Sequence, residues 1–150
     1  MHAIHNLSQY VVAPTSNHPQ AALRVLRYLK QAPGLGLFLD ANNDIKITGF
    51  SDSDWAGCPD TRKSIIRFII YLGKSPISWK LKKQCIMSRS SFEAEYRALA
   101  STTCEVQWIL YLLEDLKIQH PQLALLFCDN YSALQIVSNI VRNDYIVYTD

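Results

Sequence analysis

Residues 88–99 read SRSSFEAEYRAL, and this stretch decides how the rest of the chain is interpreted. Ser90 and Glu93 have the spacing of a capping box, in which the serine hydroxyl accepts a hydrogen bond from a free backbone N–H and the glutamate reaches back to the cap. Apolar residues then recur at helical spacing along the following segment. The pattern predicts a long helix over residues 90–116, with Glu95 at the head of the face that packs on a core.

Apolar runs separated by turn residues surround this helix. A first helix begins near Pro19, which suits an initial helical turn, and residues 1–16 before it are interpreted as a loop. Strand candidates follow, and a short helix comes after the last main strand. In chain order the strand candidates are 36–39, 45–55, 65–72, 77–79, 84–87 and 123–128, the short helix is 131–137, and 143–148 also favours a strand. This order of elements predicts a mixed α/β protein.

Composition limits the class of protein without identifying it. The chain has 150 residues, of which 49% are hydrophobic and 19% charged, as expected for a folded chain of about one domain. A net charge of +2 does not by itself indicate a nucleic-acid binder. The four cysteines have no C-x-x-C spacing, which favours reduced thiols over a zinc site or a disulfide framework. No signal peptide or membrane-length apolar run is seen, which predicts a cytoplasmic protein, with the nucleus as an alternative.

Acidic residues occur where the predicted strands end. Asp52 and Asp54 close the strand at 45–55 and face the same side of it, and Asp129 directly follows the strand at 123–128. A carboxylate at the edge of a core, such as that of Glu95, is costly without a partner, and a hard divalent cation is a suitable one. A metal site is one interpretation. In the other, the aspartates are solvated turn or N-cap residues and Glu95 lies at a partly exposed helix edge.

Several motifs of the chain resemble a known family. Residues 49–58 (GFSDSDWAGC) resemble the GYSDADWAG signature of the ribonuclease H domains of copia-type LTR-retrotransposon Pol polyproteins, and residues 88–99 resemble the family's SxSSxEAEYxAL. Residues 127–130 (FCDN) are similar to its D-N box, and 77–84 (ISWKLKKQ) to its ISWxSKKQ element. Residues 18–30 resemble the segment that joins reverse transcriptase to ribonuclease H. The order and spacing of the motifs match along most of the chain.

The resemblance implies a fold, an activity and a site. The fold would be ribonuclease H-like, a mixed five-stranded sheet with flanking helices whose first three strands form an antiparallel meander. The activity would be hydrolysis of the RNA strand of RNA–DNA hybrids during retrotransposon reverse transcription, with two Mg²⁺ (or Mn²⁺) ions as cofactors. Carried over by motif, the catalytic and metal-binding acids are Asp52, Glu95 and Asp129, with Asp54 as a neighbour.

The resemblance also implies domains and partners. Residues 1–40 would be the connection from reverse transcriptase, and 41–150 a ribonuclease H-like domain truncated at the C-terminus. The partners would be an RNA–DNA hybrid and the reverse transcriptase and integrase parts of the parent polyprotein, with no membrane. Four basic residues are candidates for contacts with the nucleic-acid backbone, or else form a solvated basic turn; they are Lys80, Lys82, Lys83 and Arg89.

The chain departs from the family pattern at two places that bear on activity. Arg67 stands where the family has glycine, and it is expected to disturb close packing in that strand. Residues 140–150 lack the family's histidines, and Asp144 and Asp150 are poorly spaced substitutes for its fourth acid, so the fourth acid and the final helix are expected to be missing. Three hypotheses follow: an active hydrolase, an inactive transposon-derived remnant that binds nucleic acid weakly at most, or an unrelated α/β interaction module.

Overall fold

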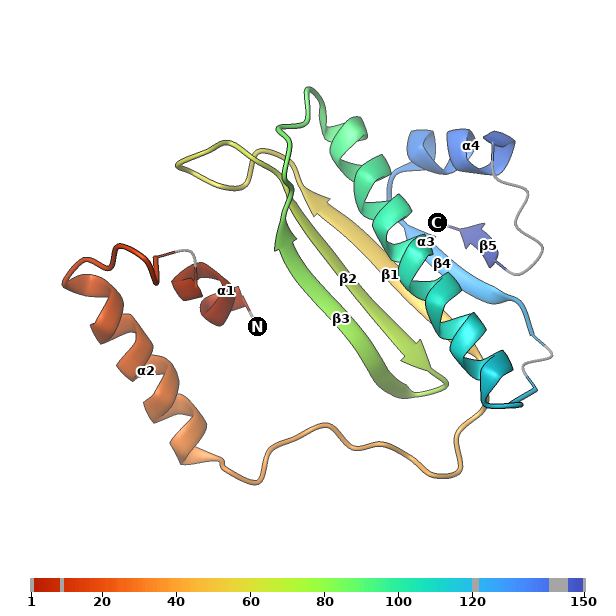
Figure 1. Ribbon diagram of the computed structural model, residues 1–150, viewed down its shortest axis with the longest axis horizontal. Helices are drawn as coiled ribbons and strands as arrows, with labels where there is room; N and C mark the ends of the chain where they lie inside the picture. The colour runs from red at the N-terminus through yellow and green to blue at the C-terminus, as the bar shows by residue number, and fades with distance from the viewer. Residues whose placement is uncertain (1, 9, 120–121, 141–145, 150) are drawn as a thin grey trace. The chain divides into compact units, whose positions relative to one another are not determined.

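The computed structural model describes residues 2–8, 10–119, 122–140 and 146–149. Its contacts divide the chain into two compact units, Met1–Leu37 and Phe38–Asp150. The first unit holds the helices α1 (His2–Ser8) and α2 (Asn17–Gln31), shown in Figure 1. The helix expected near Pro19 is confirmed as α2, whereas the interpretation of residues 1–16 as a loop is wrong over α1. The helix α1 contacts α2, and just after it the Tyr10 ring stacks on His18 at 4.2 Å between centroids; contacts of this kind are not visible in the sequence pattern.

The second unit is built on one mixed sheet (Figure 1), and it has the predicted ribonuclease H-like architecture. The strand order is β3-β2-β1-β4-β5; β1, β2 and β3 form an antiparallel meander, and β4 and β5 run parallel to β1. The bounds are β1 Ile47–Asp54, β2 Ile65–Leu72, β3 Ser75–Lys83, β4 Ala124–Cys128 and β5 Ile146–Thr149.

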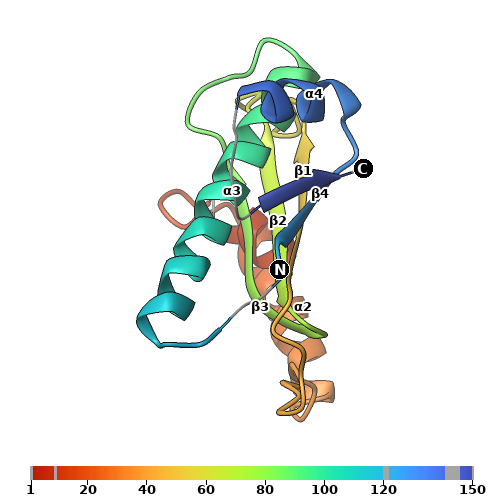
Figure 2. The ribbon, with the colours of Figure 1, turned by 90° about the vertical axis from the view of Figure 1, so that its right-hand side faces the viewer.

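A long helix covers one face of this sheet and forms the core with it. Figure 2 shows α3 (Ser91–Asp115) running along the sheet, with α4 (Tyr131–Ile140) following β4. Fully buried side chains fill the space between α3 and the sheet. They include Ile70 of β2 and Leu126 of β4 on the sheet side, and Leu99 and Val106 on the helix side. The apolar stripe predicted for the helix is therefore the face that packs on the sheet.

Two strand predictions were wrong in detail. Residues 36–39 form no strand, and Phe38 is 83% exposed, because this apolar run pairs with no strand of the described chain. The candidate at 77–79 is confirmed as the middle of a longer strand, β3, whereas the candidate at 84–87 is wrong, because these residues follow β3 and form no strand. Lys80 and Lys82 interrupt the apolar alternation after Trp79, so the sequence pattern ended the first candidate too early.

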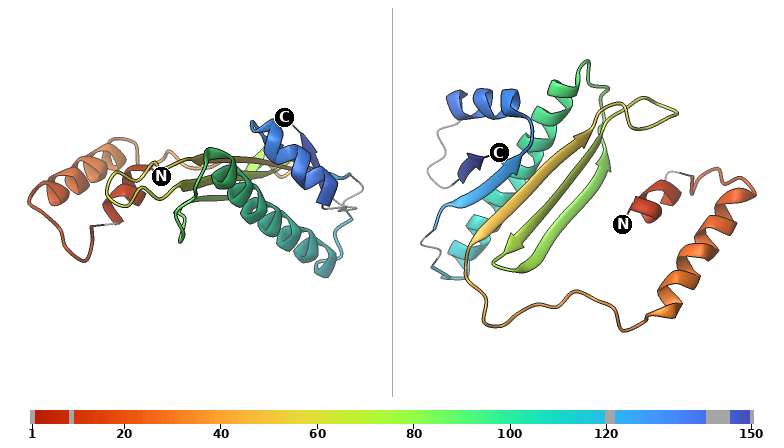
Figure 3. Two further views of the ribbon diagram at one scale, coloured as in Figure 1. Left: turned by 90° about the horizontal axis from the view of Figure 1, so that it is seen from above. Right: turned by 180° about the vertical axis from the view of Figure 1, so that it is seen from behind.

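The opposite face of the sheet carries exposed apolar side chains. In the view from behind in Figure 3, the strands lie in front of α3. Phe50 and Trp79, each 44% exposed, alternate with residues that face α3. At the C-terminal end, β5 (Ile146–Thr149) overlaps residues 146–148 of the segment predicted as a strand, whereas residues 143–145, with Asp144, and Asp150 lie outside the described residues. Across the described chain, no helix combines the length and the apolar character needed to span a membrane.

Candidate metal centre

The start of α3 places two glutamates in opposite environments. The Ser90 Oγ accepts a hydrogen bond from the Glu93 N–H at 3.1 Å, as the capping motif predicts. The Glu93 carboxylate accepts the Arg89 N–H at 2.8 Å, one residue before the cap, and also pairs with Arg97 at 2.9 Å. Glu95 lies on the next face of the helix, only 8% exposed and turned toward the sheet. The Glu93 side chain therefore makes its contacts at the surface of α3, whereas the Glu95 side chain lies on the buried face of the helix.

The carboxylate of Glu95 is only half satisfied. Its Oε1 accepts the Ser53 N–H at 3.1 Å, whereas its Oε2 is buried with no hydrogen-bond partner. Burial, and after it the negative charges of Asp52 and Asp129, raise the pKa of Glu95 to about 7, against the opposing effect of the Ser53 hydrogen bond. A buried acceptor without a partner is costly, and a bound cation would remove that cost. The donor set around Glu95 thus fits a divalent metal ion.

Asp129 and Cys128 adjoin Glu95 at the end of β4. One oxygen each of Glu95 and Asp129 and the Sγ of Cys128 all lie within 4.8 Å of one another. Burial, above all, raises the pKa of the Cys128 thiol. Carboxylate oxygens suit Mg²⁺ or Mn²⁺, while a thiolate would favour softer ions. Sequence reasoning missed Cys128 because it looked for pairs of cysteines, whereas the signal here is a single cysteine directly before the acid.

Asp52 and Asp54 form ion pairs with Arg67, an arginine of the neighbouring strand β2. The Arg67 guanidinium donates to Asp52 Oδ2 at 3.2 Å and to Asp54 Oδ2 at 2.9 Å. The strand register sets Asp52 directly opposite Arg67, and β2 pairs continuously through that position; the irregularity in its pairing with β3 lies between Ile70 and Tyr71. The expectation that Arg67 disturbs packing is wrong. Phe68, the residue after Arg67, points into the core. The Arg67 side chain therefore lies on the other face of the sheet, away from α3.

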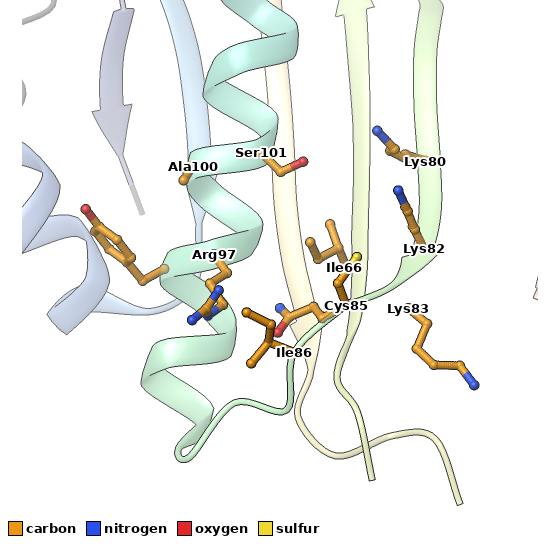
Figure 4. Close-up of a pocket in the computed structure, with 11 residues that line it drawn as sticks. Ile66, Lys80, Lys82, Lys83, Cys85, Ile86, Arg97, Ala100 and Ser101 are labelled. Carbon is orange, nitrogen blue, oxygen red and sulfur yellow. The ribbon is translucent and has the colours of Figure 1, made fainter. Parts of the chain in front are cut away.

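Only three of the four residues predicted to bind nucleic acid line a common groove. A groove of about 400 Å³ runs between β3 and α3, and Lys80, Lys82 and Lys83 are among its lining residues. Figure 4 shows Lys80 and Lys82 reaching toward α3, whereas Lys83 extends the other way. Arg97 lines the same groove from α3, a contribution that the sequence did not suggest, and Arg89 does not line it. The lysines lie in β3 and not in a basic turn.

The fold and the site together define a mixed α/β protein with a ribonuclease H-like sheet and an acidic cluster at the ends of β1 and β4 and the start of α3. The chain is similar to the retrovirus-related Pol polyproteins from the transposons RE2 and RE1 of Arabidopsis thaliana, at 46% and 44% identity over 140 residues. Those matches cover 93% of this chain and 10% of each polyprotein, so the chain spans about a tenth of their length.

A shorter relative matches a large part of this chain. The secreted RxLR effector protein 161 of Plasmopara viticola is 39% identical over 107 residues, which cover 71% of this chain and 75% of that protein. No protein-family model and no solved structure matches the chain significantly. The chain belongs to the family of sequences homologous to the retrovirus-related Pol polyproteins of transposons.

Proposed function

We propose that residues 41–150 form a ribonuclease H domain that hydrolyses the RNA strand of RNA–DNA hybrids during retrotransposon reverse transcription, and that residues 1–40 are its connection to a reverse transcriptase. The observation that supports this most directly is the buried, unpartnered Oε2 of Glu95, a carboxylate that lies close to Asp129 and whose pKa is also raised by the charge of Asp52. Homology to transposon Pol polyproteins makes such a substrate reasonable. The remaining parts of a parent polyprotein, including an integrase, would be its partners.

Asp52, Glu95 and Asp129 would hold two Mg²⁺ or Mn²⁺ ions. When bound, such ions supply an activated water and stabilise the leaving oxygen of the phosphodiester. The residues of the chain orient the ligands: the Ser53 N–H fixes one oxygen of Glu95, which leaves the other directed to the cluster. Because ionised carboxylates are required, cation binding is expected to draw the pKa of Glu95 down from about 7.

The groove between β3 and α3 would position the hybrid. Tyr96 and Arg97 line it and directly follow Glu95 in the chain, so the groove and the acidic cluster share the first turns of α3. Lys80 and Lys82 would contact phosphates within the groove, with Lys83, which also lines it, and Arg89, which does not, as further candidates. Contacts of this kind fix the register of a duplex without reading its sequence.

A second candidate function is a non-catalytic, transposon-derived protein that binds nucleic acid weakly at most. The observation that favours it is the ion pairing of Asp52 and Asp54 with Arg67, since a carboxylate already neutralised by a guanidinium is a poorer metal ligand. The two candidates share the fold and the groove and differ only in chemistry.

Cleavage of a labelled RNA–DNA hybrid by the full chain in Mg²⁺ or Mn²⁺ tests the proposal, with Asp129→Asn as the critical variant. The asparagine keeps the shape of the side chain and removes the charge that a metal ion requires, so cleavage is expected to fall to background while the protein stays folded. Asp115→Asn is the matched control: it makes the same chemical change at the far end of α3 and is expected to cleave like the unmodified chain.

Two results would contradict the mechanism. One is cleavage that survives Asp129→Asn, and the other is cleavage that persists in excess chelator. A chain that binds the hybrid but does not cleave it with either metal ion would establish the non-catalytic alternative.

A further inference from the structure

A guanidinium group pairs with one of the carboxylates proposed to bind metal, that of Asp52, and with the neighbouring Asp54. Arg67 uses one nitrogen for Asp52 and the other for Asp54, at 3.2 and 2.9 Å. Both bonds follow from the antiparallel register of β1 and β2, which pairs Asp52 with Arg67 and Asp54 with Ile65. We infer that Arg67 is a built-in competitor for divalent metal ions at Asp52, because its guanidinium occupies Oδ2 and offsets the negative charge of that carboxylate. The inference rests on the proposed metal site.

The acidic cluster is divided into two unlike halves. Around Glu95 and Asp129, a buried oxygen has no partner, so a cation would enter without displacing anything that the structure shows there. Asp52, by contrast, is half exposed, and its Oδ2 already accepts a charged hydrogen bond from Arg67. A first ion is therefore expected to bind between Glu95 and Asp129, and a second ion, which needs Asp52, is opposed by Arg67.

The competition at Asp52 is electrostatic, between the positive charges of the guanidinium and of the metal ion. Guanidinium remains protonated at any pH at which a protein is folded, so deprotonation cannot free Asp52. Its planar fork matches two carboxylates better than a lysine ammonium would, which is a compact point charge. Release must come from movement of the side chain.

Exposure of the ion pairs permits that movement. The side chain of Arg67 is 39% exposed, and those of Asp52 and Asp54 are 49% and 43% exposed. Ion pairs at such exposure are weak, typically about 1 kcal/mol or less each. A divalent ion at high concentration, or one held in place by a substrate phosphate, is therefore expected to displace the guanidinium without disturbing β2.

The test is a titration of the full chain with Mn²⁺, in which free Mn²⁺ is followed by electron paramagnetic resonance without any substrate. Arg67→Gln removes the charge and is expected to tighten Mn²⁺ binding by ~tenfold, mainly for a second ion. Arg67→Gly, the residue at this position in the resembling motif, is expected to do the same and serves if the glutamine variant folds poorly. Arg67→Lys keeps the charge and is expected to change the affinity much less.

Lys74→Gln is the matched control, because it removes one positive charge at the exposed turn beyond the other end of β2, and it is expected to leave the affinity unchanged. If the unmodified chain and both charge-removing variants bind Mn²⁺ with equal, measurable affinity, the role of Arg67 is overturned and the metal site stands. If none of them binds Mn²⁺, the metal site and this inference both fail. An equal gain in Arg67→Lys would overturn charge competition as the cause.

Discussion

Glu95 combines burial with negative neighbours, and this sets the pH dependence of the metal-free protein. Its pKa in the folded protein is about 7, above the ordinary value of 4.5. A raised folded-state pKa contributes stability that is fully present below the ordinary pKa and is lost as the pH rises through the folded value. The metal-free protein is therefore expected to lose stability between about pH 4.5 and 7 on account of this residue.

Replacement of this carboxyl by an amide tests the effect. Glu95→Gln cannot ionise, so in chelator at about pH 8 it is expected to raise the free energy of unfolding by up to about 3 kcal/mol, and near pH 4.5 to change it little. Urea unfolding at several pH values measures this. An unchanged difference between the two proteins across that range would contradict the assignment.

Glu93 provides a control of opposite sign two residues away. Its backbone hydrogen bond with Arg89, followed by its side-chain bond with Arg97, holds the pKa of Glu93 below the usual range. Its stabilising contribution is present above the ordinary pKa and lost as the pH falls through the lowered value. Glu93→Gln is therefore expected to destabilise the protein at neutral pH, where Glu95→Gln stabilises it.

Residue types and spacing predicted part of the site, and strand pairing accounts for the rest. Helical periodicity was enough to turn Glu95 inward and Glu93 outward, and the structure has them so. The ion pairs of Arg67 could not be predicted in this way. The contact between Arg67 and Asp52 depends on the register in which β1 and β2 pair, and the sequences of the two strands do not specify that register. The roles of Asp52, Glu95 and Asp129 as metal ligands stay a prediction.

At the scale of elements, α3 carries Glu95, and its first turn depends on one hydroxyl. Ser90→Ala removes the acceptor for the Glu93 N–H and is expected to cost about 1 kcal/mol of stability. Ser91→Ala is the control at the next position, where the side chain is exposed and a change within about 0.5 kcal/mol is expected. Thermal or urea unfolding distinguishes them; equal losses would show that the cap is not the stabilising contact.

The elements predicted best are those whose sequence carries one clear signal, such as an unbroken apolar run or a capped helical stripe. The β2 bounds were predicted as observed and α3 to within about one residue, because one carries an unbroken apolar run and the other a cap and a long apolar stripe. β3 was predicted too short, as residues 77–79, because its groove-facing positions hold Lys80 and Lys82. Residues 36–39 have strand-like composition, but composition cannot supply a partner strand.

On the scale of the whole molecule, the positive charge matters by its placement, because the net charge is only +2. Acidic side chains gather where β1 and β4 end, and lysines line the groove beside the first turns of α3. A nucleic-acid duplex that followed this groove would meet cations before it reached the acids, which repel phosphate until metal ions neutralise them. Binding and cleavage should therefore respond to different residues.

The contributions of the groove and of the metal centre to hybrid binding can be distinguished by the salt dependence of the affinity. The double variant Lys80→Gln/Lys82→Gln is expected to weaken binding of an RNA–DNA hybrid in chelator regardless of its sequence. It should also reduce the slope of log affinity against log salt by roughly one to two, since each phosphate contact contributes about 0.9 in duplex DNA. Asp129→Asn should leave that slope unchanged, because the acid makes no attractive contact with phosphate in the absence of metal. Fluorescence anisotropy over a range of salt concentrations measures both. A double variant with the slope of the unmodified chain would show that hybrids bind elsewhere, and the lysines would then be a solvated surface of β3.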